Sequence, residues 1–241
     1  MIRDQIYSAP RETVSKFSFN EEVATVFPDM IRRSVPGYDL IIDQIRMLTR
    51  HYERSHCNYY DLGCSLGAVS AAMGQVLTAK ACQIIAVDNS AAMINKCRQQ
   101  LSNINTPATI HLICSNIEDI NIQRAQMVIL NFTLQFIEPP RREHLLKKIH
   151  QGLLPGGLVI LSEKIKASTD ESQQLYTEWH HAFKKYQGYS DLEISQKRTA
   201  LEQVLIADTL QTHHKRLYSC GFSRVEPWFQ CFNFMSILAF K

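Results

Sequence analysis

The chain has 241 residues, of which 45% are hydrophobic and 20% charged, and its formal net charge is +3 at pH 7. These values are ordinary for a globular protein and exclude a disordered or fibrous chain. The charge is mild and no Lys/Arg cluster with interleaved aromatic residues stands out, so direct binding of nucleic acid is not expected.

The cysteines and histidines predict a reducing compartment and no metal. The seven cysteines form no C-x-x-C pair and are interpreted as small hydrophobic residues. The histidines include no H-E-x-x-H motif, and the adjacent pairs His180-His181 and His213-His214 would diverge on a helix. With no signal peptide and no long apolar run, the expectation is a cytoplasmic protein without membrane association.

Residues 1–57 are predicted to form a helical arm. Apolar residues recur at helical spacing in 21–35 and 39–52, and Pro36-Gly37 separates the two segments. No strand is expected before Asn58.

The most informative motif follows, Asp61-Leu-Gly63-Cys-Ser65-Leu-Gly67. It predicts a strand, a tight glycine turn and a helix, and glycine there permits the close approach of a ligand to the backbone. Folds that bind S-adenosylmethionine (SAM) commonly carry an acid at the position of Asp61, where it can accept from the amino group of the methionine moiety. A dinucleotide fingerprint would instead read G-x-G-x-x-G.

A second acid, Asp88, ends the apolar run that begins at Cys82. Carboxylates at the carboxyl ends of parallel strands commonly accept from ribose hydroxyls, and this is the role predicted for Asp88. The alternative is that Asp61 and Asp88 only cap the helices that follow them. Their occurrence together, one after each strand, favours a nucleoside pocket.

The residues Gly63 to Gly67 also match the G-x-S-x-G nucleophile elbow of hydrolases, with Ser65 as the nucleophile. An elbow serine normally follows several strands, whereas the residues before Asn58 are predicted to be helical. No His-Gly-Gly stretch precedes the motif to supply an oxyanion donor. Ser65 is therefore interpreted as a small turn residue of a nucleoside site.

Strands and helices alternate after the motif. Strands are predicted at 82–88, 109–114, 125–131 and 157–162, with helices at 90–101 and 140–151, which indicates βαβ units and a parallel sheet. Residues 165–220 are helical and polar and are interpreted as an inserted lid or oligomer contact. Two β-like runs at 222–229 and 232–240 predict a closing antiparallel hairpin.

This order is that of the Rossmann-like class I methyltransferase fold, an α/β fold with a mostly parallel sheet. The chain is expected to be a single domain, with the sheet core formed by residues 58–164 and 221–241.

Longer segments resemble the carboxy-S-adenosyl-L-methionine synthase family of bacterial tRNA modification. The likeness covers nearly the whole chain, and the segments that carry it are 26–38 (VFPDMIRRSVPGY), 61–65 (DLGCS), 128–136 (VILNFTLQF), 188–190 (GYS), 195–202 (SQKRTALE) and 228–234 (WFQCFNF).

The resemblance implies a homodimeric enzyme that converts SAM and prephenate into carboxy-S-adenosylmethionine (carboxy-SAM) and phenylpyruvate. It also implies a functional link to a separate tRNA carboxymethyltransferase that uses the product on wobble uridine. By the same resemblance, the contacts to SAM fall on Tyr38, Gly63, Cys64, Ser65, Asp88, Asn89, Asn116, Ile117, Asn131 and Arg198. An acid is expected beside the adenine, where this chain has Asn116, whose side-chain carbonyl can still accept from an exocyclic amine.

Arg198 is the predicted catalytic residue, because a guanidinium can hold the new carboxylate with two parallel hydrogen bonds. The alternative is that Lys197 and Arg198 lie on the helix surface, in i,i+4 pairs with Glu193 and Glu202. Ordinary methyl transfer to a small molecule and a non-catalytic SAM-binding subunit remain alternative functions.

Overall fold

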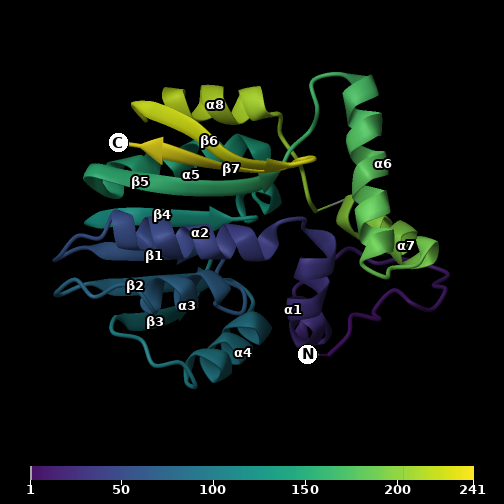
Figure 1. Cartoon of the computed structure of the whole chain (residues 1–241), viewed down its shortest axis with the longest axis horizontal. Coiled ribbons are helices and arrows are strands. Elements are labelled where there is room, and N and C mark those ends of the chain that lie inside the picture. The colour runs from purple at the N-terminus through teal and green to yellow at the C-terminus, as the bar shows by residue number, and fades with distance from the viewer. Residues whose placement is uncertain (1, 203) are drawn as a thin grey trace.

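The computed structural model describes residues 2–202 and 204–241, and within them a seven-stranded sheet is covered by helices on both faces (Figure 1). The strands are β1 (Asn58–Leu62), β2 (Gln83–Asp88), β3 (Thr109–Cys114), β4 (Ala125–Asn131), β5 (Leu153–Lys164), β6 (Arg224–Cys231) and β7 (Phe234–Phe240). The helices are α1 (Glu21–Ser34), α2 (Tyr38–His51), α3 (Ala68–Gly74), α4 (Ala91–Leu101), α5 (Pro139–Gly152), α6 (Asp170–Tyr186), α7 (Asp191–Glu202) and α8 (Leu210–Ser219), with a short 3-10 turn at Leu134–Phe136.

The strand order is β3-β2-β1-β4-β5-β7-β6. The first five strands pair in parallel, whereas β7 pairs antiparallel with both β5 and β6. The predicted Rossmann-like class I methyltransferase fold and its closing hairpin are therefore confirmed. The strands β1 to β3 are added toward one edge of the sheet, and β4 is added on the other side of β1. Such a reversal of strand order leaves a crevice outside the carboxyl ends of the strands.

Residues of alternate parity along the central strands pack on opposite faces of the sheet. Tyr59 and Ile129 face a core shared with α2 and α3, while Tyr60 and Leu130 face a core shared with α5 and α8. Both faces of β4 are buried, as is typical of a central strand in a parallel sheet with helices on both faces.

Polar residues start the helices that border the crevice. Asn20 and Ser90 cap α1 and α4 by accepting from the backbone N–H three residues later. Helix α2 begins directly after the Pro36-Gly37 turn, where Gly37 has φ 76°. These signals explain why both helices of the predicted arm form where the periodicity placed them.

Helices α1, α6 and α7 lie beyond one end of the strands, at the right of Figure 1. The segment 165–220 differs from the expected insert in one respect, since α8 packs against α5 and β6 and covers the sheet. Although most residues of α8 are polar, its Leu217 belongs to the central core and its Leu210 packs against that core. None of the described helices is long and apolar enough to cross a membrane.

Candidate functional site

A cavity of about 770 Å³ lies at the carboxyl ends of β1, β2 and β4. It is bordered by the loops that follow these strands and by residues of α1, α6 and α7. The cavity wall includes all ten predicted site positions: Tyr38, Gly63, Cys64, Ser65, Asp88, Asn89, Asn116, Ile117, Asn131 and Arg198. The fold thus brings these positions together, and their contacts with a ligand stay a prediction.

The glycine turn after β1 has the conformation that its sequence demands. Gly63 has φ 82°, and a Cβ there would overlap the side chain of Thr133. Ser65 is also left-handed, with φ 51°, and its N–H donates to Asp88 Oδ2 at 2.9 Å. The turn is therefore held against the end of β2, with Ser65 as a turn residue. Among the described residues, no histidine is hydrogen-bonded to the Ser65 hydroxyl, which contacts Met93 Sδ at 3.5 Å.

Asp88 holds two turns and also borders the cavity. Its Oδ1 accepts from the Ser90 N–H at 2.9 Å, and its Oδ2 accepts from Ser65. Asp88 is not itself the cap of α4, because the N-cap is Ser90; it orders the turn before that helix. This does not exclude the ribose role, because each carboxylate oxygen can accept more than one hydrogen bond. Burial raises the pKa of Asp88 despite these two donors.

Asp61 lies deeper in the same wall, with 1% of its surface exposed. Its Oδ2 accepts from the N–H and the hydroxyl of Ser70, in the first turn of α3. Burial raises the pKa of Asp61 to about 7, with a further contribution from the negative charge of Asp88. A cationic amino group in the cavity would stabilise the ionised carboxylate.

The end of β4 and the loop after it contribute a side-chain acceptor and a strained backbone position. Phe132 has φ 62°, which a bulky residue rarely adopts. The preceding Asn131 places its Oδ1 at a buried position where no partner is found among the described residues, and this residue borders the cavity. Such an atom can accept from a ligand donor.

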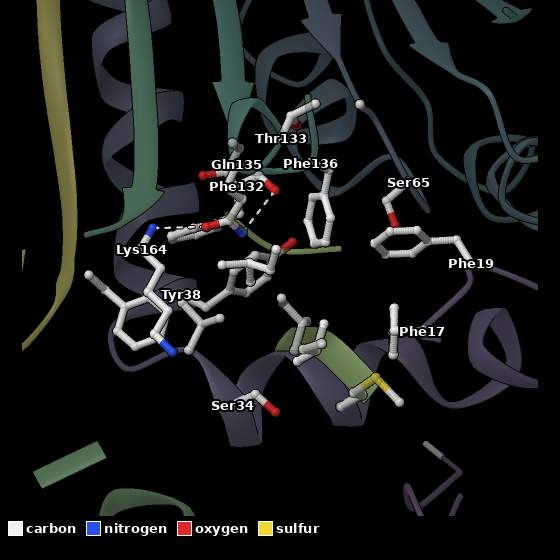
Figure 2. Close-up of a pocket in the computed structure, with 18 of the residues that line it drawn as sticks. Phe17, Phe19, Ser34, Tyr38, Ser65, Phe132, Thr133, Gln135, Phe136 and Lys164 are labelled. Carbon is white, nitrogen blue, oxygen red and sulfur yellow. Dashed lines mark hydrogen bonds between the residues drawn. The ribbon is translucent and has the colours of Figure 1, made fainter. Parts of the chain in front are cut away.

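Aromatic rings form much of the remaining wall (Figure 2). Phe19 lies edge-on to Phe17 and to Phe136, at centroid distances of 5.1 and 5.3 Å, and Tyr38 lies 6.4 Å from Phe132. These rings supply an apolar surface of the kind that a nucleoside and an unsaturated ring can contact.

The loops after β2 and β3 are joined by side-chain amides. Asn89 Nδ2 donates to Asn116 Oδ1 at 3.1 Å, and both residues are exposed. The Asn116 carbonyl is therefore engaged, and Ile117 beside it is buried. Contact between Asn116 and an adenine amine would require this hydrogen bond to be shared or exchanged.

The far end of the cavity is cationic. Lys164 at the end of β5, Lys184 on α6, and Lys197 and Arg198 on α7 all border it. Burial and the neighbouring positive charges lower the pKa of Lys184 to about 7. Although His180 and His181 are adjacent on α6, both border the cavity, and burial lowers the pKa of His180 to about 2.

Lys197 and Arg198 have opposite environments. Arg198 pairs with Glu202 at 2.7 Å, with 58% of its side chain exposed, as the surface alternative predicted. Lys197 is buried, so the surface alternative is wrong for this residue. Its expected partner Glu193 instead accepts from Ser190 at the start of α7.

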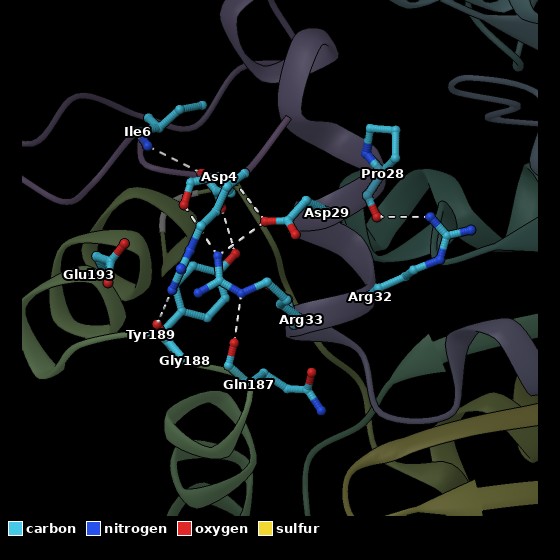
Figure 3. A network of polar contacts seen from close by, with 12 residues as sticks. Asp4, Ile6, Pro28, Asp29, Arg32, Arg33, Gln187, Gly188, Tyr189 and Glu193 are labelled. Carbon is cyan, nitrogen blue, oxygen red and sulfur yellow. Dashed lines mark hydrogen bonds and ion pairs between the residues drawn. The ribbon is translucent and has the colours of Figure 1, made fainter. Parts of the chain in front are cut away.

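The partners of Lys197 come from the N-terminal segment and α1. Its ammonium lies 3.4 Å from Asp4 Oδ2 and donates to Ser34 Oγ at 2.9 Å. Asp4 also accepts from the Tyr189 hydroxyl at 2.5 Å. Figure 3 shows Asp4 and Tyr189 beside Arg33, whose guanidinium lies 3.7 Å from the Tyr189 ring centroid. Two members of this Asp4–Lys197 network, Lys197 and Ser34, border the cavity.

The sequence interpretation missed Asp4, Lys164 and Lys184. The i,i+4 spacing of His180 and Lys184 on a helix was a usable signal, since it places both side chains on one helical face. No local pattern indicates that Asp4 reaches α7, because its contact spans 193 residues.

Comparisons with known proteins support the fold and the family. Residues 60–157 match a family described as a methyltransferase domain. A carboxy-S-adenosyl-L-methionine synthase of Trichlorobacter lovleyi is 54% identical over 243 residues, covering 99% of this chain and 98% of that protein. The Vibrio cholerae protein of the same name is 50% identical over 239 residues, covering 99% of this chain and 97% of its own.

Solved structures share the fold at low identity. A putative O-methyltransferase of Nostoc punctiforme has a TM-score of 0.66 at 18% identity and covers 92% of this chain and 59% of its own. Human N-acetylserotonin methyltransferase in complex with SAM has a TM-score of 0.61 at 18% identity, covering 92% and 55%. Identity of about one half to curated relatives over nearly the whole length shows that the chain belongs to the carboxy-S-adenosyl-L-methionine synthase family.

Proposed function

We propose that this protein is a transferase that converts SAM and prephenate into carboxy-SAM and phenylpyruvate. The observation that carries the proposal is the division of one cavity into two ends. Asp61, Asp88 and Asn131 present acceptors at the sheet end, while Lys164, Lys184 and Arg198 present cations at the other. Ordinary methyl transfer has no use for cations beside a sulfonium, which they would repel.

The two ends suit the two substrates. At the sheet end, Asp88 would accept from the ribose hydroxyls and Asp61 from the methionine amino group, whose positive charge would favour the ionised acid; both residues border the cavity. Prephenate carries two carboxylates and a ring, which fit the cations and the aromatic wall. Arg198 is the proposed catalytic residue, since its guanidinium would hold the carboxylate that forms on the SAM methyl carbon.

The chemistry needs little from a protein base. Sulfonium methyl protons are acidic, and decarboxylation of prephenate releases carbon dioxide while the departing hydroxide takes a methyl proton. The resulting ylide carbon attacks the carbon dioxide and forms the carboxylate. The chain would therefore contribute substrate positioning, exclusion of water by its aromatic wall and cationic stabilisation of the product.

We further propose that the protein acts as a homodimer in the cytoplasm and supplies carboxy-SAM to a separate tRNA carboxymethyltransferase. The name of the relatives supports the formation of carboxy-SAM, which such a transferase would consume. Gel filtration with light scattering would measure the oligomeric state.

The deciding experiment is the mass of the product. Purified protein is incubated with SAM and prephenate, and the SAM derivative is analysed by mass spectrometry. We expect carboxy-SAM only when both substrates are present, together with phenylpyruvate in equal amount. A methylated acceptor, or no turnover of prephenate, would contradict the proposal.

A further inference from the structure

Lys184 is the feature of the cavity that the proposed reaction has not yet used. It lies in the last turn of α6 and is 6% exposed. Among the residues that the structure describes, its ammonium group makes no hydrogen bond and no ion pair. The side chain of Lys184 is almost wholly buried and it borders the cavity, so its ammonium group is desolvated relative to a surface lysine. A negatively charged ligand in the cavity would stabilise it.

A second lysine approaches from the sheet. Lys164 is half-buried at the end of β5 and its ammonium likewise has no partner in the described part of the chain. The positive charge of Lys164 lowers the pKa of Lys184, as do those of Lys197 and Arg198, so these groups act on one small volume.

The acids near these lysines are already engaged. Asp4 pairs with Lys197, and Glu202 pairs with Arg198. Within the described part of the chain, Lys164 and Lys184 therefore border the same cavity without an ion pair of their own, although the charge of Glu202 opposes the lowering of the Lys164 pKa.

The nucleoside end does not share this charge. The positive charges that shift Lys164 and Lys184 come from β5 and α7, whereas the pKa of Asp61 responds to Asp88 and not to a lysine. The lysine pair comes from β5 and α6, whereas the acids expected to hold SAM come from β1 and β2.

We infer that Lys184 and Lys164 form an anion subsite that binds a carboxylate of the second substrate and is distinct from Arg198, which receives the new carboxylate. This assignment rests on the proposed function. Two ammonium groups on different elements suit a dicarboxylate better than a monocarboxylate, so the subsite would select the dianionic substrate and release the monoanionic product. Lys184 and Lys164 are then specificity-determining residues.

The test compares Lys184→Met with a matched neighbour, Lys185→Met. Lys185 is exposed and pairs with Asp191 at 2.6 Å, so its loss removes a charge from the same helix outside the cavity. We expect Lys184→Met to raise the KM for prephenate about 30-fold or more, with the dissociation constant for SAM within twofold of wild type. Lys185→Met should change neither value, and Lys184→Arg should recover part of the loss.

Two results would overturn the subsite. One is a change of less than threefold in the KM for prephenate in both Lys184→Met and Lys164→Met. The other is an equal loss of SAM affinity, which would assign the lysines to the methionine carboxylate of SAM. Thermal unfolding of each variant checks that the fold persists.

Failure of the proposed function is distinguishable from failure of the subsite. If wild-type protein forms no carboxy-SAM, calorimetric titration with prephenate in the presence of SAM measures binding directly. Binding to wild type that is lost in Lys184→Met would support the subsite without the reaction. Absence of binding to wild type would overturn the subsite as well.

Discussion

The two ends of the cavity are built from different kinds of structure. At the sheet end, the acceptors lie at the carboxyl ends of β1, β2 and β4, and hydrogen bonds such as that from the Ser65 N–H to Asp88 fix the neighbouring turns. At the cationic end, Lys184 and Arg198 lie on helices joined to the N-terminal segment by side-chain contacts. The first end is held by local geometry, and the second by contacts between segments distant in sequence.

The two ends should therefore respond differently to side-chain substitutions. Because strands and glycine turns define the nucleoside end, single side-chain changes there should alter affinity more than the fold. The cationic end depends on a few buried polar contacts, so substitutions in the Asp4–Lys197 network should alter stability and the position of α7. The variants below separate these two responses.

The largest effect is expected for Asp4→Asn, which leaves Lys197 buried without its ion pair. Asp4 and Lys197 have side chains only 2% and 5% exposed. Loss of one partner of a buried pair costs about 3 kcal/mol in the free energy of unfolding, measured by urea denaturation at pH 6. Burial lowers the pKa of Lys197 to about 8, so the loss should be smaller at pH 9, where the lysine is neutral.

The double variant Asp4→Asn, Lys197→Met tests the cause of this loss. It should recover part of the stability, because no unpaired charge remains. A loss below about 1 kcal/mol for Asp4→Asn would show that the Asp4–Lys197 network does not hold the N-terminal segment to α7.

The pH dependence of stability probes the sheet end. Burial raises the pKa of Asp61 to about 7 from 3.8, so the folded protein holds this proton over a range in which the unfolded chain releases it. The contribution of Asp61 to stability is therefore present below pH 4 and is lost as pH rises to 7, by on the order of a few kcal/mol. Asp61→Asn, followed by denaturation across this range, should lack that component. Equal pH profiles for the two proteins would contradict the burial of an uncompensated acid.

Arg198→Ala measures the contact between the cationic end and the product. SAM lacks a carboxylate at its methyl carbon, so its affinity should change little, while that for carboxy-SAM should fall by about 2 kcal/mol. The ion pair with Glu202 and the exposure of Arg198 keep this value below that of a buried pair. Arg198→Lys should recover only part, because an ammonium lacks the two-pronged geometry. The affinities for SAM and carboxy-SAM are measured by calorimetry. Equal losses of affinity for the two ligands would mean that Arg198 holds the part of the molecule that they share.

The sequence predicted the sheet end of the cavity better than the cationic end. The glycine turn and the acids after β1 and β2 were identifiable because each depends on a local pattern, a strand end followed by Gly or Asp. The antiparallel β6 and β7 were predictable from their short connection. The resemblance of longer segments added Tyr38, Asn131 and Arg198, whose places on the cavity wall no local pattern indicates.

The cationic end was not predictable in the same way. Charged helical residues ordinarily face solvent, and nothing near Lys197 in the sequence distinguishes it from Arg198. Lys197 is nevertheless buried, because Asp4 and Ser34 reach it from segments far away along the chain. For α8, a polar composition concealed the single apolar stripe through which it packs on the sheet.

A smaller effect is expected for Asp88→Ala at the nucleoside end. Removal of an acceptor for ribose hydroxyls should weaken SAM binding by about 1.5 kcal/mol, measured by calorimetry. Since Asp88 also accepts from Ser65 and Ser90, a thermal unfolding curve is needed to show that the turn persists. Unchanged affinity in a folded variant would remove Asp88 from the ligand contacts.

The smallest effect is expected for Ser65→Ala, which distinguishes a turn residue from a nucleophile. The hydrogen bond from position 65 to Asp88 uses the backbone N–H, which alanine retains. The Ser65 hydroxyl is hydrogen-bonded, as far as the structure describes the chain, to the sulfur of Met93 alone, so its loss should leave turnover of SAM and prephenate within about twofold of wild type. Abolished turnover with SAM binding preserved would restore Ser65 as a nucleophile. Because alanine tolerates a φ of 51° less well than glycine, Ser65→Gly is the matched control for strain, and a defect in alanine alone would assign the effect to the backbone.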